Sequence, residues 1–131
     1  MAEQYSVLIV GETPEKVDFS DPAVPEGTTP ETIRAGLEAS LDELRSAGRR
    51  ADLVYLDDMV SAPAQMAEAL GCASYDVIVV GAGLRIIPKQ TEMFEVVMNI
   101  IRQAAPAATL AFNLKPDDSA AAAERQLARR T

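Results

Sequence analysis

Residues 75–85 read Tyr75-Asp76-Val77-Ile78-Val79-Val80-Gly81-Ala82-Gly83-Leu84-Arg85. The β-branched run at 77–80 is bounded by turn-forming residues, which is typical of a strand buried on both faces at the centre of a parallel sheet. The two glycines allow a tight turn, and Arg85 places a fixed positive charge beside it. Because ligands of open α/β sheets bind outside the carboxyl ends of the strands, we expect a site at this turn.

Four strand-like runs alternate with four helical patterns along the chain. The predicted strands are 5–10, 51–56, 77–80 and 109–114, and the predicted helices are 29–48, 62–70, 91–105 and a final segment from Asp117 or Ser119. Strands separated by helices imply right-handed crossovers and a parallel sheet. We therefore predict one three-layer α/β domain over residues 1–131, doubly wound and flavodoxin-like, with strand order 2-1-3-4.

Several helix ends have recognisable signals. The first helix is expected to start at Thr28 or Thr29, with Glu31 able to complete a capping box from Thr28, and Gly48 is a plausible end for it. Gly71 is a plausible end for the second helix, and Asp58, more than Ser61, is expected to cap its start. The neighbouring Asp57 would point to the opposite side of its strand, so the pair is not expected to share a metal ion.

Composition excludes several kinds of function. The net charge is −8 and the chain has no histidine. An acidic protein lacks the basic face that nucleic acid or an anionic membrane surface requires, so we expect neither partner. Without histidine the commonest general base and most zinc sites are missing, and we predict no metal site. Cys72 is the single cysteine, and we expect it to be a small buried residue. Because no internal disulfide can form and the N-terminus does not resemble a signal peptide, we expect the protein to be cytoplasmic.

The Gly-x-Gly turn resembles the opening of a dinucleotide-binding fingerprint but departs from it. Ile86 occupies the third glycine position, Pro88 keeps a helix from starting directly at the turn, and Asn113 replaces the acidic residue that would hold a ribose. The layout also resembles that of phospho-receiver domains, but there is one acid after the first strand and none after the third. A flavin phosphate cradle is disfavoured by the acids of the first loop. The cofactor, if any, is unknown.

A more general anion site remains at the turn. Backbone N–H groups beside Arg85 can hold a carboxylate or phosphate, although the arginine can equally pair with Glu12, across the crevice. The salt-bridge role is favoured for Glu12, since an acid beside a guanidinium stays ionised. No catalytic residue is assigned. The predicted ligand-binding residues are Gly11, Glu12, Thr13, Gly81, Ala82, Gly83, Leu84, Arg85 and Asn113.

Three functions follow from this pattern. The favoured one is the binding of a small anionic molecule between the first and third strands. The second is a metal-assisted enzyme that acts on such a molecule through Glu12, or through Asp18 and Asp21 with a divalent cation. The third is an interaction or regulatory module without small-molecule chemistry.

A long loop and an apolar helix face are two further features of the sequence. The stretch 12–29 is long for a compact domain, and we expect an ordered cover over a sheet edge, anchored by Phe19, that can also close over a ligand. The helix at 91–105 has an apolar face wider than one sheet contact needs. Together with the edge strand at 109–114, this face predicts a possible homodimer.

Overall fold

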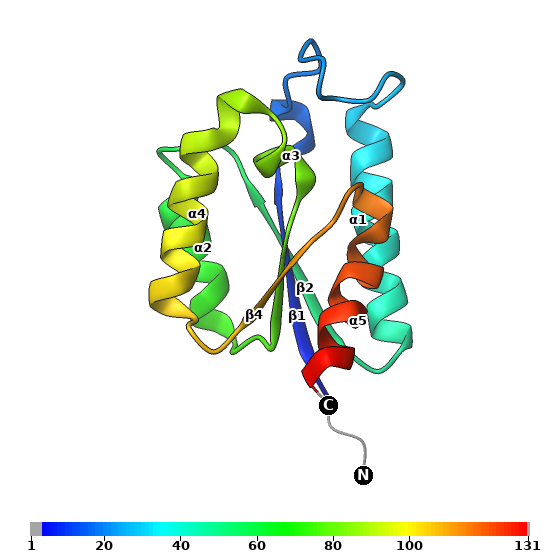
Figure 1. Cartoon of the computed structure of the whole chain (residues 1–131), viewed down its shortest axis with the longest axis vertical. Helices are drawn as coiled ribbons and strands as arrows, with labels where there is room; N and C mark the ends of the chain where they lie inside the picture. Colours follow the sequence, from blue (N-terminus) through cyan, green and yellow to red (C-terminus); the bar gives the residue numbers. More distant parts are fainter. Residues whose placement is uncertain (1–3, 131) are drawn as a thin grey trace.

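The computed structural model describes residues 4–130 and contains one four-stranded parallel sheet in the order β2-β1-β3-β4 (Figure 1). The predicted flavodoxin-like order is therefore confirmed. The strands are β1 (Ser6–Glu12), β2 (Arg50–Leu56), β3 (Val77–Val80) and β4 (Thr109–Phe112).

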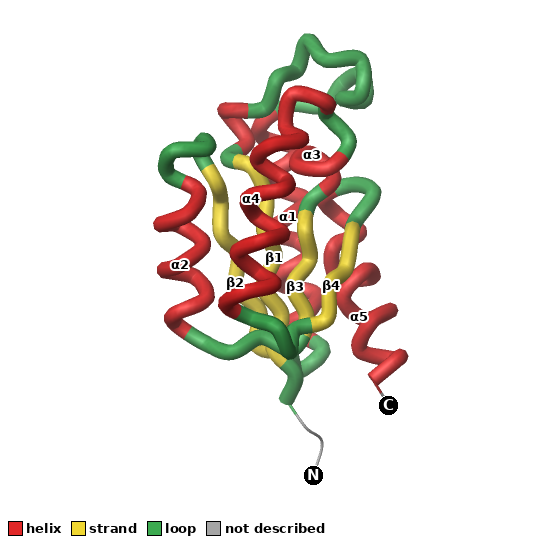
Figure 2. The backbone as a smooth tube through the Cα atoms, turned by 60° about the vertical axis from the view of Figure 1, so that its left-hand side comes forward, coloured by secondary structure: helices red, strands yellow, loops and turns green. Residues whose placement is uncertain are grey.

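Helices cover both faces of this sheet, which gives the predicted three layers (Figures 1 and 2). One face carries α1 (Pro30–Ser46) and α5 (Ser119–Arg130); the other carries α2 (Ala62–Cys72), α3 (Ala82–Arg85) and α4 (Thr91–Ala104). Three 3-10 turns, η1 (Pro14–Lys16), η2 (Pro88–Gln90) and η3 (Pro116–Asp118), lie at the carboxyl end of the sheet. The long loop after β1 rises above that same end (Figure 1).

The two central strands supply both halves of the core. In β1, Val7 and Ile9 pack toward α1 and α5, while Leu8 and Val10 pack toward α2 and α4. All four are 0–1% exposed, as the period-2 geometry of a strand covered on both faces requires. Full burial of each such side chain stabilises the fold by about 1.5–3 kcal/mol. The apolar runs at 5–10 and 77–80 thus mark the centre of the sheet.

The first strand continues further than the apolar run predicts. Gly11 and Glu12 belong to β1 because they pair with Tyr55 and Leu56 of β2. The last residue of this central strand is therefore a buried glutamate at the carboxyl end of the sheet.

Two helix-end predictions were wrong: the capping box between Thr28 and Glu31, and the end of the second helix at Gly71. The cap of α1 is Thr29, whose side chain accepts the N–H of Thr32 while the Thr32 hydroxyl accepts the N–H of Thr29. Threonine replaces the acidic partner expected at Glu31, because the helix starts one residue later than Thr28. Gly71 lies within α2 rather than ending it.

The turn after β3 also differs from expectation. A single helical turn, α3, begins directly after Gly81, although Pro88 was expected to prevent this. The turn ends at Arg85, before Pro88 starts η2, so the proline never enters the helix. Cys72 was expected to be buried and is exposed, because it is the last residue of α2, where the helix ends.

The wide apolar face of α4 is partly used within the chain. Met93, Val97 and Ile101 are buried, and the Phe94 ring lies 6.4 Å from the Phe112 ring of β4. A dimer through α4 and β4 stays a prediction.

A close approach between α1 and η3 requires glycine at position 36. A Cβ there would lie 2.9 Å from the Pro116 Cβ and 3.1 Å from the Asp117 backbone nitrogen. We expect Gly36→Ala to lower the free energy of unfolding by about 1 kcal/mol, because overpacking of about 1–3 kcal/mol exceeds the helix-propensity gain of about 1 kcal/mol. Urea unfolding measures the change.

Gly71→Ala is the matched control, since a Cβ at Gly71 meets nothing within 4 Å. It keeps the propensity gain without the clash and should stabilise the protein. Equal stabilisation by both substitutions would show that α1 and η3 separate without cost.

Candidate functional site

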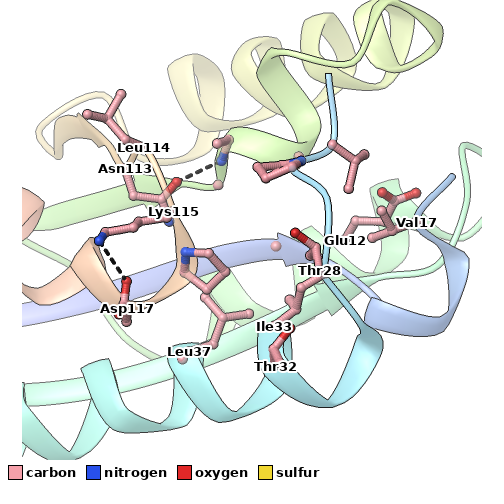
Figure 3. A pocket seen from close by; sticks show the side chains of 18 of the residues that line it. Glu12, Val17, Thr28, Thr32, Ile33, Leu37, Asn113, Leu114, Lys115 and Asp117 are labelled. Atoms are coloured by element: carbon pink, nitrogen blue, oxygen red, sulfur yellow. Dashed lines mark hydrogen bonds and ion pairs between the residues drawn. The ribbon is translucent and has the colours of Figure 1, made fainter. Parts of the chain in front are cut away.

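A cavity of about 660 Å³ lies at the carboxyl ends of β1 and β3, the edge at which the sequence predicts a site. Its walls come from the end of β1, the loop over residues 13–29, the first half of α1, the turn after β3, and the segment that links β4 to α5. Figure 3 shows Ile33 and Leu37 of α1 facing this space from below. The cavity therefore brings together three stretches that are distant in sequence: residues 11–39, 81–87 and 113–117.

The wall is largely apolar, with polar groups set apart from one another. In the close view, Glu12 lies toward one end and the Lys115–Asp117 pair toward the other (Figure 3). The apolar lining residues include Val17, Val24, Pro25, Ile33, Leu37, Ile86, Ile87, Leu114 and Pro116. A mainly apolar wall with a few polar groups is usual for small-molecule sites.

Six of the nine predicted site residues line this cavity: Gly11, Glu12, Gly81, Ala82, Gly83 and Asn113. The other three have structural contacts elsewhere. The Thr13 hydroxyl donates to Asp57, Leu84 is fully buried in the core, and Arg85 faces β4. The rule that strand ends form the site thus located the region, but it did not identify which side chains enter the cavity.

Arg85 does not form the expected pair with Glu12. Its Nη2 donates to the Asn113 carbonyl at 2.6 Å, and its guanidinium carbon lies 5.5 Å from the centre of the Phe112 ring. The arginine ends the one-turn helix α3, which directs it toward β4, on the opposite side of β3 from β1. The carbonyl at the end of β4 then takes the place of the expected carboxylate.

Three N–H groups of the turn after β3 already have acceptors within the protein. Gly81 donates its N–H to the Val10 carbonyl at 2.8 Å, and Ala82 donates to the Asn113 side-chain oxygen at 2.7 Å. Leu84 donates to the Gly81 carbonyl at 3.1 Å. These three N–H groups are therefore not free to hold an anion, contrary to the expectation for this turn.

The glycines of the turn have different roles. A Cβ on Gly81 would lie 3.2 Å from the Val10 carbonyl oxygen and 3.7 Å from the Gly11 Cα, so the ends of β1 and β3 touch here. A Cβ on Gly83 would meet no atom within 4 Å. There is therefore no room for a side chain at Gly81, whereas the space beside Gly83 is open.

Glu12 is the most unusual polar group in the cavity wall. The residue is 7% exposed, and its Oε2 accepts a hydrogen bond from the Gln90 amide. Its Oε1 is buried and has no hydrogen-bond partner within residues 4–130. Burial raises the pKa of this carboxyl to about 7, although the Gln90 hydrogen bond acts in the opposite direction. An unsatisfied buried oxygen costs stability, so packing alone does not account for a carboxyl at this position.

Asn113 joins three elements rather than pointing freely into the cavity. It is 2% exposed, its Oδ1 accepts the Ala82 N–H, and its Nδ2 donates to the Ser119 hydroxyl at 2.8 Å. The side chain therefore fixes the turn after β3 against the start of α5.

The loop over residues 13–29 covers the cavity instead of a sheet edge. Val17, Val24, Pro25 and Thr28 of this loop line the cavity. Phe19, expected to anchor the loop, is 36% exposed and does not line the cavity, whereas Val17 and Val24 are partly buried and do. The expected cover exists, but its anchors were assigned wrongly.

Two ion pairs fasten this loop from outside. Lys89 meets Asp18 at 2.6 Å and Arg34 meets Glu15 at 2.8 Å. The Lys89 hydrogen bond lowers the pKa of Asp18 to about 2, so Asp18 is an ion-pair partner at neutral pH.

The acidic pair after β2 has structural partners. Asp58 was expected to cap α2, but Ser61 is the N-cap residue; Asp58 accepts the Ser61 N–H at 2.7 Å instead. Asp57 accepts from Gln65 at 2.8 Å. Over residues 4–130, no group of three or more acidic or cysteine side chains is placed to hold a metal ion.

Some residues of the cavity escaped the sequence analysis. Lys115 and Asp117 follow the end of β4, and the strand-end rule, applied past Asn113, would have included them. Gln90, the partner of Glu12, has no such signal, because only the fold brings η2 above β1.

Comparison with known proteins supports the fold alone. No known protein family matches the chain. No curated protein matches it either. One similar solved structure is a fragment called a lipoprotein, from Peptoclostridium difficile 630, with a TM-score of 0.53 and 13% identity over 97% of this chain and 98% of that one. Within the part of the chain that the structure describes, no helix combines the length and apolarity needed to cross a bilayer.

Proposed function

We propose that this protein binds a small molecule in the cavity between the ends of β1 and β3. The carrying observation is a cavity of about 660 Å³ that holds a buried carboxyl with an unpartnered oxygen. Sites for small molecules usually occupy about 300–1,000 Å³. In α/β sheets they lie at the switch point, where two neighbouring strands are followed by helices on opposite faces of the sheet, as β1 and β3 are here. The loop over residues 13–29 supplies a cover that shields a bound molecule from water.

A binding role fits the lining better than an enzymatic one. The polar side chains of the wall are spread over the cavity, and Asn113 is committed to internal hydrogen bonds. The acid that acts on Glu12, Asp18, is held ionised by Lys89 and is therefore a poor partner for a shared proton transfer. A cytoplasmic location stays a prediction.

Gly83→Leu tests the proposal by adding a side chain to the cavity wall. Its Cβ meets nothing within 4 Å and its backbone is helical, so the variant should fold. Naphthylmethanol is a suitable neutral probe, followed by the amide NMR shifts of the lining residues. We expect the probe to perturb these amides in the wild type and to bind at least about tenfold more weakly to Gly83→Leu, since each 1.4 kcal/mol lost is tenfold.

Gly71→Leu is the matched control. Gly71 is also a helical glycine with open space around it, and it does not line the cavity. Its affinity should equal that of the wild type. Shifts confined to other surfaces, or equal binding by both variants, would disprove a site at the switch point.

A further inference from the structure

Resting on the proposed function, we propose that the cavity selects a molecule with an apolar body and a positively charged amine, and that the amine pairs with Glu12. This reverses the sign of the ligand expected from the sequence. The charges of the wall, the state of Glu12 and the composition of the remaining surface each support it.

The cavity offers little to an anion. Among the described residues of the wall, Lys115 is the only cation, and it lies 3.9 Å from Asp117, which shares the wall. Arg85 is turned to the Asn113 carbonyl. With the N–H groups of Gly81, Ala82 and Leu84 bonded inside the protein and a net charge of −8, the electrostatic field disfavours a carboxylate or phosphate.

Glu12 offers what a cation needs. Gln90 satisfies Oε2, and Oε1 has no partner within the described chain. A buried carboxylate oxygen gains most from a charged N–H donor, because such hydrogen bonds are stronger than neutral ones. The two cations of the loop contacts, Lys89 and Arg34, are already held by Asp18 and Glu15. The missing partner of Oε1 is therefore expected to come from a ligand.

The rest of the wall suits an apolar body. Ile33 and Leu37 lie between the Glu12 end and the Lys115 end of the cavity (Figure 3). Ile86 and Ile87 add apolar surface from the other side. A molecule anchored at Glu12 would bury its apolar part along α1, with a gain of about 25 cal/mol per Å².

Access to Oε1 requires the covering loop to move. The loop is fastened by two ion pairs at the surface: the Lys89 and Asp18 side chains are 73% and 30% exposed, and the Glu15 and Arg34 side chains are 56% and 37% exposed. Ion pairs at such exposure contribute little net stability. The two ion pairs therefore oppose loop opening only weakly, and a ligand amine then supplies the partner that Oε1 lacks within the described chain.

Three probes with one ring system test the inference: naphthylmethylamine, naphthylmethanol and naphthoate. NMR titration at pH 8 keeps the amine charged and Glu12 mostly ionised. We expect the amine to bind about tenfold or more tightly than the alcohol, and naphthoate to bind most weakly, as a charged hydrogen bond of about 1.5–3 kcal/mol implies. Glu12→Gln should bring the amine and the alcohol to equal affinity.

Glu15→Gln is the control, because Glu15 belongs to the same loop contacts but does not line the cavity. It should keep the preference for the amine. If the alcohol binds and Gly83→Leu weakens it, but the amine binds no more tightly, the amine inference fails while the binding function stands. Tighter binding of naphthoate than of the amine also overturns the inference. If none of the three probes binds, the proposed function fails with it.

Discussion

Glu12→Gln is expected to raise the melting temperature at pH 8 by roughly 6–8 °C, which corresponds to about 2 kcal/mol for a chain of this size. The carboxyl is buried with one unpartnered oxygen, so its charged form is disfavoured in the fold. A neutral amide keeps the hydrogen bond from Gln90 and removes the buried charge. Because the wild-type residue costs stability, its presence is best explained by a function at the cavity.

The pH dependence gives this prediction its sign. Burial raises the pKa of Glu12 from 4.5 to about 7, so the folded chain holds a proton more tightly than the unfolded chain does. The stabilising effect of that proton is complete below pH 4.5 and is lost as the pH rises through 7. The groups around Glu12 are the Gln90 amide, which lowers its pKa, and Asp18, which raises it and is itself paired with Lys89.

The melting temperatures of wild type and Glu12→Gln are therefore compared at pH 5 and pH 8. The advantage of the variant should shrink by more than half at pH 5. Glu26→Gln, an exposed change in the same loop, should leave the melting temperature unchanged at both pH values. A constant advantage across this range would show that Glu12 titrates normally and that its burial has no electrostatic cost.

The fold was more predictable than the site, for a local reason. The run 77–80 and the run 5–10 are each apolar on both faces, and this property places them in the centre of a parallel sheet. Chain order and right-handed crossovers then determine the remaining neighbours. These are properties of short segments, so the sequence contains them directly.

The direction of a side chain at a strand end depends on contacts that no short segment contains. Arg85 turns away from the cavity because a single helical turn separates it from β3 and the Asn113 carbonyl lies within reach. Glu12 becomes buried because a distant 3-10 turn places Gln90 above it. The sequence located the edge of the sheet and the glycine turn, whereas the charge facing a ligand depends on tertiary packing.

Asn113 illustrates the same difference and gives the last prediction. Predicted as a ligand contact, it connects the Ala82 N–H to the Ser119 hydroxyl while buried at the cavity wall. Asn113→Ala leaves the buried N–H without an acceptor and should lower the free energy of unfolding by about 2–3 kcal/mol. Urea denaturation measures this loss.

The matched control is Asn99→Ala on the exposed side of α4, which removes an asparagine without a buried partner and should leave stability unchanged or slightly higher, because alanine favours helix. Equal effects of the two substitutions would mean that water replaces the Asn113 contacts and that the turn after β3 is not fixed by them. A large loss at position 113 alone would instead show that the wall containing Gly83 is held in place before any ligand arrives. The cavity would then be preorganised on the β3 side, and adaptation to a ligand would be confined to the loop over residues 13–29.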